Sequence, residues 1–197
     1  MIPRCLAITP GRPGPWLHQL SRLVDAGVDG ILIRLTEAPA SLPDVLDALP
    51  AGLIVLVRPV LPGDAALAIG RGLGLHLPSA IPPASWRPQQ TGLLSAACHN
   101  RAALLRAAAA GADMALLSPV YAPGSKPHDS RPPLGPAGFA ALAATVPTPV
   151  LALGGITPAR AASLPAVAAG VAGISAFFGG GHVRPSAAAA LSAALRR

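Results

Sequence analysis

The chain has 197 residues, a formal net charge of +7 and a hydrophobic fraction of 52%. A chain of this length is expected to form one domain, residues 1–197, with a core large enough to need no disulfide or metal. Its basic residues are scattered and aromatic residues make up only 3%, which argues against a nucleic-acid-binding protein.

The sequence also argues against a membrane or secreted protein. No run of 18 apolar residues occurs, and the first residues lack the basic and apolar regions of a signal peptide. Cys5 and Cys98 lie far apart without CxxC spacing, so we expect neither a disulfide framework nor a zinc site. A reduced, cytoplasmic setting fits this composition, and oligomerisation is left open.

Eight short apolar runs alternate with segments rich in Ala and Leu. The runs are too short for helices and are apolar throughout, which is typical of strands buried on both faces of a parallel sheet. In chain order they are 5–9, 30–35, 53–57, 74–77, 93–97, 114–118, 150–153 and 173–176.

Helices are predicted in the intervening segments. The clearest is 101–110, a run of strong helix formers that ends at Gly111. Prolines between residues 80 and 92 predict that the fourth helix is short or missing. The other predicted helices are 16–26, 42–49, 65–70, 136–145, 158–164 and 186–195. Eight strand–helix units favour a small (β/α)8 TIM barrel, with a doubly wound open sheet as the alternative.

In a TIM barrel, the loops that follow the strands carry the chemistry, and phosphate commonly binds after strands seven and eight. Gly154 and Gly155 follow the seventh run and open a helix, where backbone N–H groups attract an anion. Ser175, at the eighth run, can donate its hydroxyl to the same anion. A glycine pair can also be a simple tight turn, but its position beside Ser175 favours a phosphate site.

Three further side chains are candidates for the chemistry. His99 follows the fifth run and can transfer protons near neutral pH, although a histidine at a helix start is often only a capping or surface residue. Arg34 ends the second run and can hold a carboxylate or phosphate in the barrel mouth. Lys126 is the only lysine and lies in a long loop after the sixth run; it could equally be a solvated surface residue. No pair of acidic residues occupies two such loops, which argues against a Mg²⁺ site.

Two segments resemble the thiamine phosphate synthase and TenI family. GADMALLSPVYAPGSKP is similar to that family's sixth strand and lysine loop, and PVLALGGITPARAASLPAVAAGVAGISAFF to its Gly-Gly-Ile segment and final strand. The resemblance implies a (β/α)8 barrel with the substrate phosphate on Gly154, Gly155, Ile174 and Ser175. It also implies that Lys126 matches the lysine that faces a pyrophosphate in the synthases, and Arg34 their strand-two arginine.

Elsewhere the sequence departs from the synthase pattern. Leu32 and Thr36 replace the family's glutamine and lysine beside Arg34, and Ala97 replaces a serine. Arg58-Pro59 stands at the Asn-Asp pair and Ile81 at the acidic position, both implicated in holding Mg²⁺. The resemblance is therefore closer to the TenI branch, an isomerase that tautomerises a carboxythiazole phosphate with a histidine at the position of His99.

The sequence thus predicts a thiazole phosphate tautomerase of thiamine biosynthesis. His99 is its expected general acid/base, with Arg34 on the carboxylate and Lys126 over the anion. The expected ligand is a phosphorylated thiazole, with no cofactor or metal. One alternative is a Mg²⁺-dependent thiamine phosphate synthase, a transferase with metal ligands elsewhere, such as Asp129. The other is a barrel that binds a phosphorylated ligand without catalysis.

Overall fold

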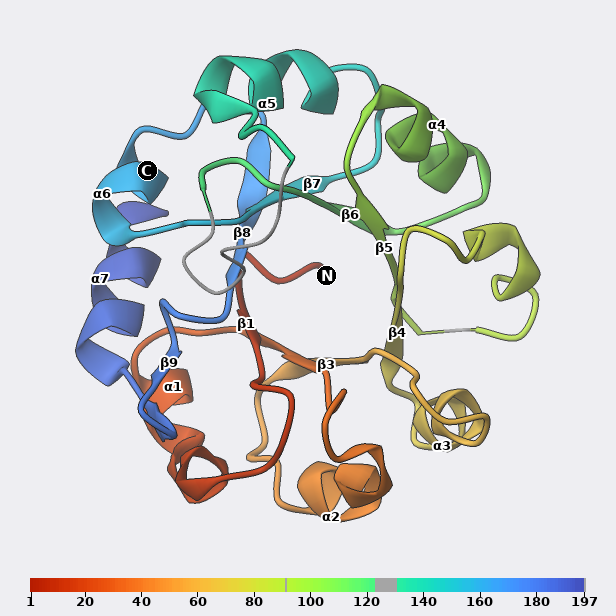
Figure 1. The fold of residues 1–197 in the computed structure, drawn as a ribbon, viewed down its shortest axis with the longest axis vertical. Coiled ribbons are helices and arrows are strands. Elements are labelled where there is room, and N and C mark those ends of the chain that lie inside the picture. Colours follow the sequence, from red (N-terminus) through yellow and green to blue (C-terminus); the bar gives the residue numbers. More distant parts are fainter. Residues whose placement is uncertain (91, 123–130, 197) are drawn as a thin grey trace.

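The computed structural model describes residues 1–90, 92–122 and 131–196. Eight parallel strands close into a barrel in the order β1 to β8, and the helices form a ring outside them (Figure 1). This confirms the predicted small TIM barrel and rules out the open sheet. The strands are β1 (Cys5–Ile8), β2 (Gly30–Ile33), β3 (Ile54–Val57), β4 (Gly74–Leu77), β5 (Leu94–Cys98), β6 (Met114–Leu117), β7 (Val150–Leu153) and β8 (Ala168–Gly173).

The helices follow the prediction with small shifts at their ends. Between β4 and β5 the described residues form only the short 3-10 turn η3 (Pro83–Ser85), which confirms the missing fourth helix. The α-helices are α1 (Ser21–Asp25), α2 (Leu42–Asp47), α3 (Asp64–Gly70), α4 (Arg101–Ala109), α5 (Gly135–Ala143), α6 (Pro158–Ala162) and α7 (Pro185–Ala194), and 3-10 turns η1 (Pro15–Gln19) and η2 (Pro39–Ser41) precede α1 and α2.

Local chemistry explains where α4 begins and ends. The side chain of Asn100 accepts a hydrogen bond of 2.9 Å from the backbone N–H of Ala103, which caps the helix start. Gly111 has a φ of 76°, the left-handed conformation that commonly ends a helix. The helix therefore starts after the two residues that follow β5, and its cap at Asn100 fixes the position of His99 between the strand and the helix.

The eighth strand is displaced from its predicted position. It spans Ala168–Gly173, and residues 173–176 lie at its end and in the turn that follows. Its residues are mostly small and give a weak hydrophobic signal, but small size is required because a Cβ at Gly170 would collide with the backbone of Arg4 before β1. The short hairpin of β9 (Phe178–Gly179) and β10 (His182–Val183) was not predicted either.

Side chains alternate between the barrel interior and the helix layer, as the pleat of a strand requires. The interior cluster consists of Leu6, Ile8, Leu32, Leu56, Met114, Leu116, Leu151 and Ala172. A second, larger cluster packs the outer faces of the strands against the helices, and it includes both free cysteines, Cys5 and Cys98.

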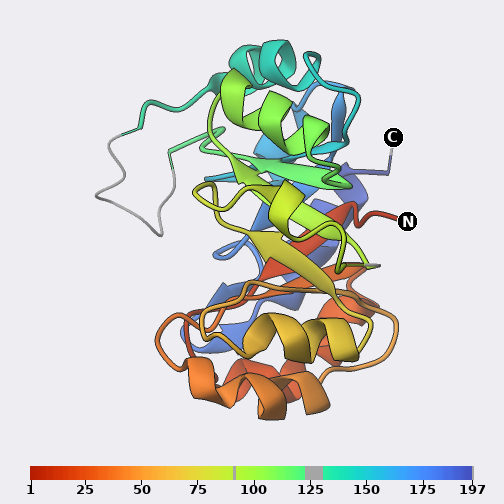
Figure 2. The same cartoon turned by 90° about the vertical axis from the view of Figure 1, so that its right-hand side faces the viewer.

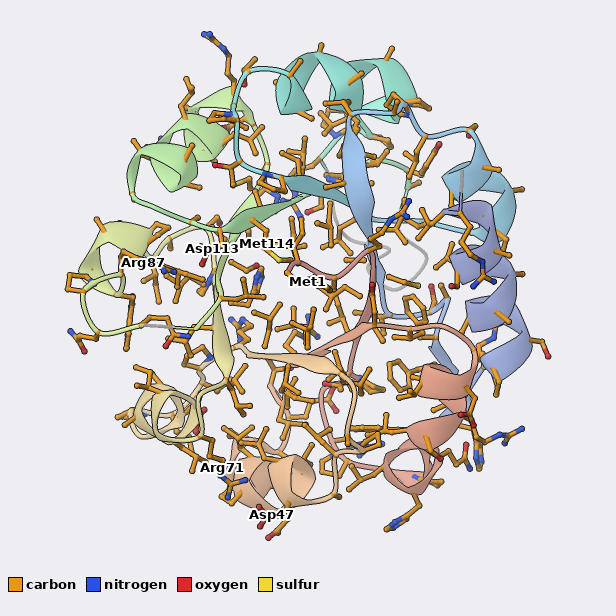
Figure 3. The ribbon with its side chains drawn as sticks, turned by 180° about the vertical axis from the view of Figure 1, so that it is seen from behind. Met1, Asp47, Arg71, Arg87, Asp113 and Met114 are labelled. Atoms are coloured by element: carbon orange, nitrogen blue, oxygen red, sulfur yellow. The ribbon has the colours of Figure 1, made fainter. Side chains whose placement is uncertain are left out.

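Two aspartates anchor strands at the amino-terminal end of the barrel. Asp29 accepts hydrogen bonds from the backbone N–H groups of Arg4 and Cys5, at 2.9 and 2.8 Å. Asp113 accepts from the backbone N–H of Leu94 at 2.7 Å and pairs with Arg87 at 2.8 Å, and Figure 3 labels this pair on the rear of the molecule. Figure 2 shows the amino terminus at this same end.

No described helix is both long enough and apolar enough to span a membrane.

The interior cluster should dominate stability. Leu151→Ala removes a side chain that is fully buried inside the barrel and should lower the free energy of unfolding by about 2–5 kcal/mol. Leu105→Ala on the exposed face of α4, where 41% of the residue is accessible, should cost less than about 1 kcal/mol. Urea unfolding of both variants measures the difference, and equal costs would contradict this description of the core.

Candidate active site

A cavity of about 280 Å³ opens at the carboxyl ends of the strands. The strand residues that line it are those whose alternation points them inward, such as Ile8, Leu32 and Leu116 from the interior cluster. The next inward positions, two residues further along their strands, carry Arg34 and Ser118. The apolar core therefore gives way to polar groups at the mouth.

Two arginines form one side of this cavity. Arg34 and Arg58 follow β2 and β3, whose last residues Ile33 and Val57 are register partners. Burial and the charge of Arg58 lower the pKa of Arg34, while Glu37 opposes the shift. The Nε atom of Arg34 is buried and has no hydrogen-bond partner among the described residues.

The next inward position along this side is His76 of β4. Its Nδ1 lies 2.7 Å from the hydroxyl oxygen of Ser95, its register partner on β5, and both residues are buried. Burial, with a smaller contribution from Arg58, lowers the pKa of His76 to about 3. The imidazole is therefore neutral at physiological pH and serves as a polar wall of the cavity.

His99 lies on the neighbouring part of the wall, immediately after β5. Its Nδ1 donates to the backbone carbonyl oxygen of Ser118 at 2.9 Å, and the hydroxyl of Ser118 lies 3.2 Å from the same nitrogen. Because a carbonyl oxygen can only accept, this bond places the ring proton on Nδ1. The lone pair of Nε2 is left to act on a ligand.

Two turns form the opposite wall. Gly154 and Gly155 have φ values of 101° and 62°, and a Cβ on Gly155 would lie 2.5 Å from the carbonyl oxygen of Ala122. The guanidinium of Arg160 donates to the Gly155 carbonyl at 2.7 Å, and that of Arg184 to the Ser175 carbonyl at 2.8 Å.

Arg160 and Arg184 thus donate hydrogen bonds to a carbonyl oxygen in each turn. Among the described residues, the backbone N–H groups of Gly155, Ile156 and Ser175 donate to no backbone carbonyl. Both turns line the cavity, so their N–H groups form a suitable seat for an anion. We refer to Gly154, Gly155, Ile174 and Ser175 as the glycine cup.

The structure brings most of the predicted site residues to one cavity. Arg34, His99 and the four residues of the glycine cup all line it. Lys126 lies outside the described residues, as does Asp129, the alternative metal ligand. Ile81 is exposed and lines a separate cavity with Cys98 rather than this one.

Sequence reasoning did not assign three residues that the structure adds to this cavity. Arg58, His76 and Ser118 line it together with the predicted residues. Arg58 and Ser118 lie two residues beyond Leu56 and Leu116 of the interior cluster, so counting onward along these strands would have found two of the three.

The described residues do not fit a magnesium ion. None of the described side chains that line the cavity is a carboxylate. Throughout the described part of the chain, no group of three or more His, Cys, Asp or Glu residues is placed to hold a metal. Mg²⁺ in proteins is bound mainly through carboxylates and phosphates, whereas this wall offers guanidinium groups.

Comparison with known proteins supports the family to which the motifs point, and curated proteins with matching sequences are named as synthases. Residues 5–177 match the TMP-TENI family, described as thiamine monophosphate synthase. The thiamine-phosphate synthase of Methanoculleus marisnigri is 39% identical over 181 residues, covering 85% of this chain and 83% of the relative. A ThiM/ThiE bifunctional protein for thiamine biosynthesis from Symbiobacterium thermophilum is 36% identical over 115 residues, covering 57% of this chain and 23% of the relative.

Solved structures support the fold. A thiamine phosphate pyrophosphorylase from Pyrococcus furiosus superimposes with a TM-score of 0.77 at 20% identity, covering 98% of this chain and 95% of the other. N-(5'-phosphoribosyl)anthranilate isomerase from the same organism gives a TM-score of 0.65 at 15% identity, with 98% of both chains covered. On the strength of its sequence match from residue 5 to residue 177, the chain belongs to the thiamine monophosphate synthase (TMP-TENI) family of thiamine-biosynthesis enzymes.

Proposed function

We propose that this member of the family is a thiazole phosphate tautomerase, in which His99 is the general acid/base. The observation that carries the proposal is the hydrogen bond from His99 Nδ1 to the Ser118 carbonyl, which leaves Nε2 as a base inside the cavity. A tautomerisation needs a group that removes a proton from one ring position and returns it at another. It needs no leaving group and therefore no metal to stabilise one.

The remaining wall residues have roles that suit this reaction. The glycine cup would hold the phosphate of the thiazole through backbone N–H groups. Arg34 would orient the carboxylate of the ring, and Lys126, which lies outside the described residues, would cover the anion. Holding both ends of the substrate keeps its reacting carbon at a constant distance from His99.

A thiamine phosphate synthase is the second candidate, because the similar curated proteins carry that name. Its reaction joins a hydroxymethylpyrimidine pyrophosphate to thiazole phosphate and expels pyrophosphate, a step that a metal ion assists. The lack of carboxylates among the described lining residues favours the tautomerase. A barrel that only binds its phosphorylated ligand is the third candidate.

Replacing the proposed base tests the assignment. His99→Gln should reduce tautomerase turnover by about 100- to 10,000-fold, the usual contribution of a general base, while the affinity for thiazole phosphate changes little. His18→Gln, on the exposed surface of η1, should leave turnover unchanged. Steady-state kinetics and calorimetric titration give the two measurements.

Two outcomes would contradict the proposal. Condensation of the two synthase substrates that stops when a chelator is added would establish the synthase instead. If the unmodified protein binds thiazole phosphate but shows no turnover, the result would favour the inactive binding barrel.

The glycine cup can be tested separately from the base. Gly155→Ala places a methyl group against the Ala122 carbonyl in a strained left-handed conformation, and should weaken thiazole phosphate binding at least tenfold. Gly52→Ala is a matched control, because Gly52 also has a positive φ, 89°, but lies in a turn after α2 away from the cavity. Equal affinities of the two variants in calorimetric titration would show that the phosphate binds elsewhere.

His76 should affect stability rather than proton transfer. Its folded-state pKa of about 3 is below the ordinary value of 6.5, so the unfolded chain takes up the proton first as the pH falls. Between pH 7 and pH 5 this linkage should lower the free energy of unfolding by about 2 kcal/mol. His76→Gln should remove that loss, and His18→Gln should not. Chemical denaturation at both pH values measures it, and an identical loss in all three proteins would contradict the buried, neutral state of His76.

A further inference from the structure

The register of the barrel places three basic side chains in a row. Ile33 pairs with Val57 across β2 and β3, and Val57 pairs with Leu75 across β3 and β4. The residues that follow these three partners are Arg34, Arg58 and His76, and all three line the cavity. Ile33, Val57 and Leu75 face outward. Because neighbouring residues on a strand face opposite sides, the residues that follow them face inward.

The two arginines of this row lack a carboxylate partner. The ion pairs among the described residues involve Arg12, Arg71 and Arg87, but neither Arg34 nor Arg58. Glu37 influences the pKa of Arg34, but this side chain is 63% exposed and its ion-pair contact is with Arg12 at 3.9 Å. Two partly buried guanidinium groups that face the same cavity repel each other, and an anion bound between them would offset this repulsion.

The buried Nε of Arg34 supports the same conclusion. It is one of the few buried side-chain nitrogen or oxygen atoms that find no partner among the described residues. A buried donor without an acceptor costs free energy that a bound anion would recover. His76 adds no positive charge to this row near neutral pH, because burial beside Ser95 lowers its pKa to about 3.

The row also lies across the cavity from the glycine cup. The cup follows β7 and β8, and in a closed ring of eight strands the positions opposite these are β3 and β4. Figure 1 shows β3 and β7 on opposite sides of the barrel axis. His99, after β5, lies on the wall between the two regions, so a ligand that spans them passes the imidazole.

We infer that Arg34 and Arg58 form a second anion subsite, which holds an anionic group at the end of the substrate remote from its phosphate and does so without a divalent cation. The guanidinium planes can bind a carboxylate or phosphate oxygens through paired hydrogen bonds. Resting on the proposed function, the group is the carboxylate of a carboxythiazole phosphate. A pyrophosphate on a second substrate has the same chemistry, and the experiment distinguishes the two.

The test compares two ligands that differ only in the carboxylate. Carboxythiazole phosphate and thiazole phosphate are titrated calorimetrically into the unmodified protein, Arg58→Gln and Arg71→Gln, each with EDTA and with Mg²⁺. Arg71 is the matched control, since it follows α3 at the amino-terminal end of β4 and pairs with Asp47, as labelled in Figure 3. Hydroxymethylpyrimidine pyrophosphate is titrated under the same conditions.

We expect the unmodified protein and Arg71→Gln to bind the carboxylated ligand at least tenfold more tightly than thiazole phosphate, with EDTA as well as with Mg²⁺. Arg58→Gln should bind both ligands equally and keep its affinity for thiazole phosphate. Tight pyrophosphate binding in EDTA that is lost in Arg58→Gln would also support the subsite, while assigning it to the synthase substrate.

A preference that survives in Arg58→Gln, or one that requires Mg²⁺, would overturn the inference. Failure of the proposed function is a separate result, because loss of tautomerase turnover with an intact carboxylate preference leaves the subsite in place. Circular dichroism of Arg58→Gln confirms that the comparison is made on folded protein.

Discussion

The site depends on the alternation of side chains along eight parallel strands that close into a ring, because the register of the strands decides which residues face the cavity. Each strand end contributes its chemistry through the inward-facing position, and a shift of one residue would turn that position toward the helices. On β5 such a shift would exchange His99 for Cys98, whose thiol packs in the outer layer, where burial raises its pKa to about 11. The reactivity of the cavity is therefore set by the same contacts that hold the barrel together.

The aspartates at the opposite end help to hold that register. Asp113 accepts the backbone N–H of Leu94, the first residue of β5, and so fixes the strand that carries His99. Asp29 does the same for Cys5 at the start of β1. At the carboxyl end, Arg34 and Arg58 line the cavity, and none of its described lining residues is a carboxylate. The mouth is therefore basic and suited to anionic ligands.

Much of the fold was predictable because buried parallel strands leave a clear pattern. Seven of the eight apolar runs correspond to strands within about a residue or two at each end. The eighth was misplaced because Ala168–Gly173 is built from small residues, whose function is to let strands approach closely rather than to fill the core. Such a requirement comes from a neighbouring backbone and cannot be seen in the hydrophobicity of the segment.

The site was predictable where a single strand end or turn identifies it. Gly154 and Gly155 were predicted as site residues because they open a helix at a strand end beside Ser175, and His99 because it follows an apolar run. Arg58 and His76 were not assigned to the site from the sequence, because their place in it depends on pairing between β2, β3 and β4. Ser95 was missed within its apolar run for the same reason, since only the register shows that it faces His76.

The two walls of the cavity differ in what they determine. The two segments whose motifs resemble the family are 111–127 and 149–178, which include β6 to β8 and the glycine cup. The departures from the synthase pattern lie mainly on β2 to β4, where the resemblance aligns Arg58 with a position that holds Mg²⁺ in the synthases. A guanidinium is permanently charged and binds an anion through directional hydrogen bonds, whereas Mg²⁺ needs oxygen ligands and keeps bound water. The family match spans both walls of the cavity, since it runs from residue 5 to residue 177. The departures on β2 to β4 are the part of this chain on which the proposed proton-transfer reaction depends.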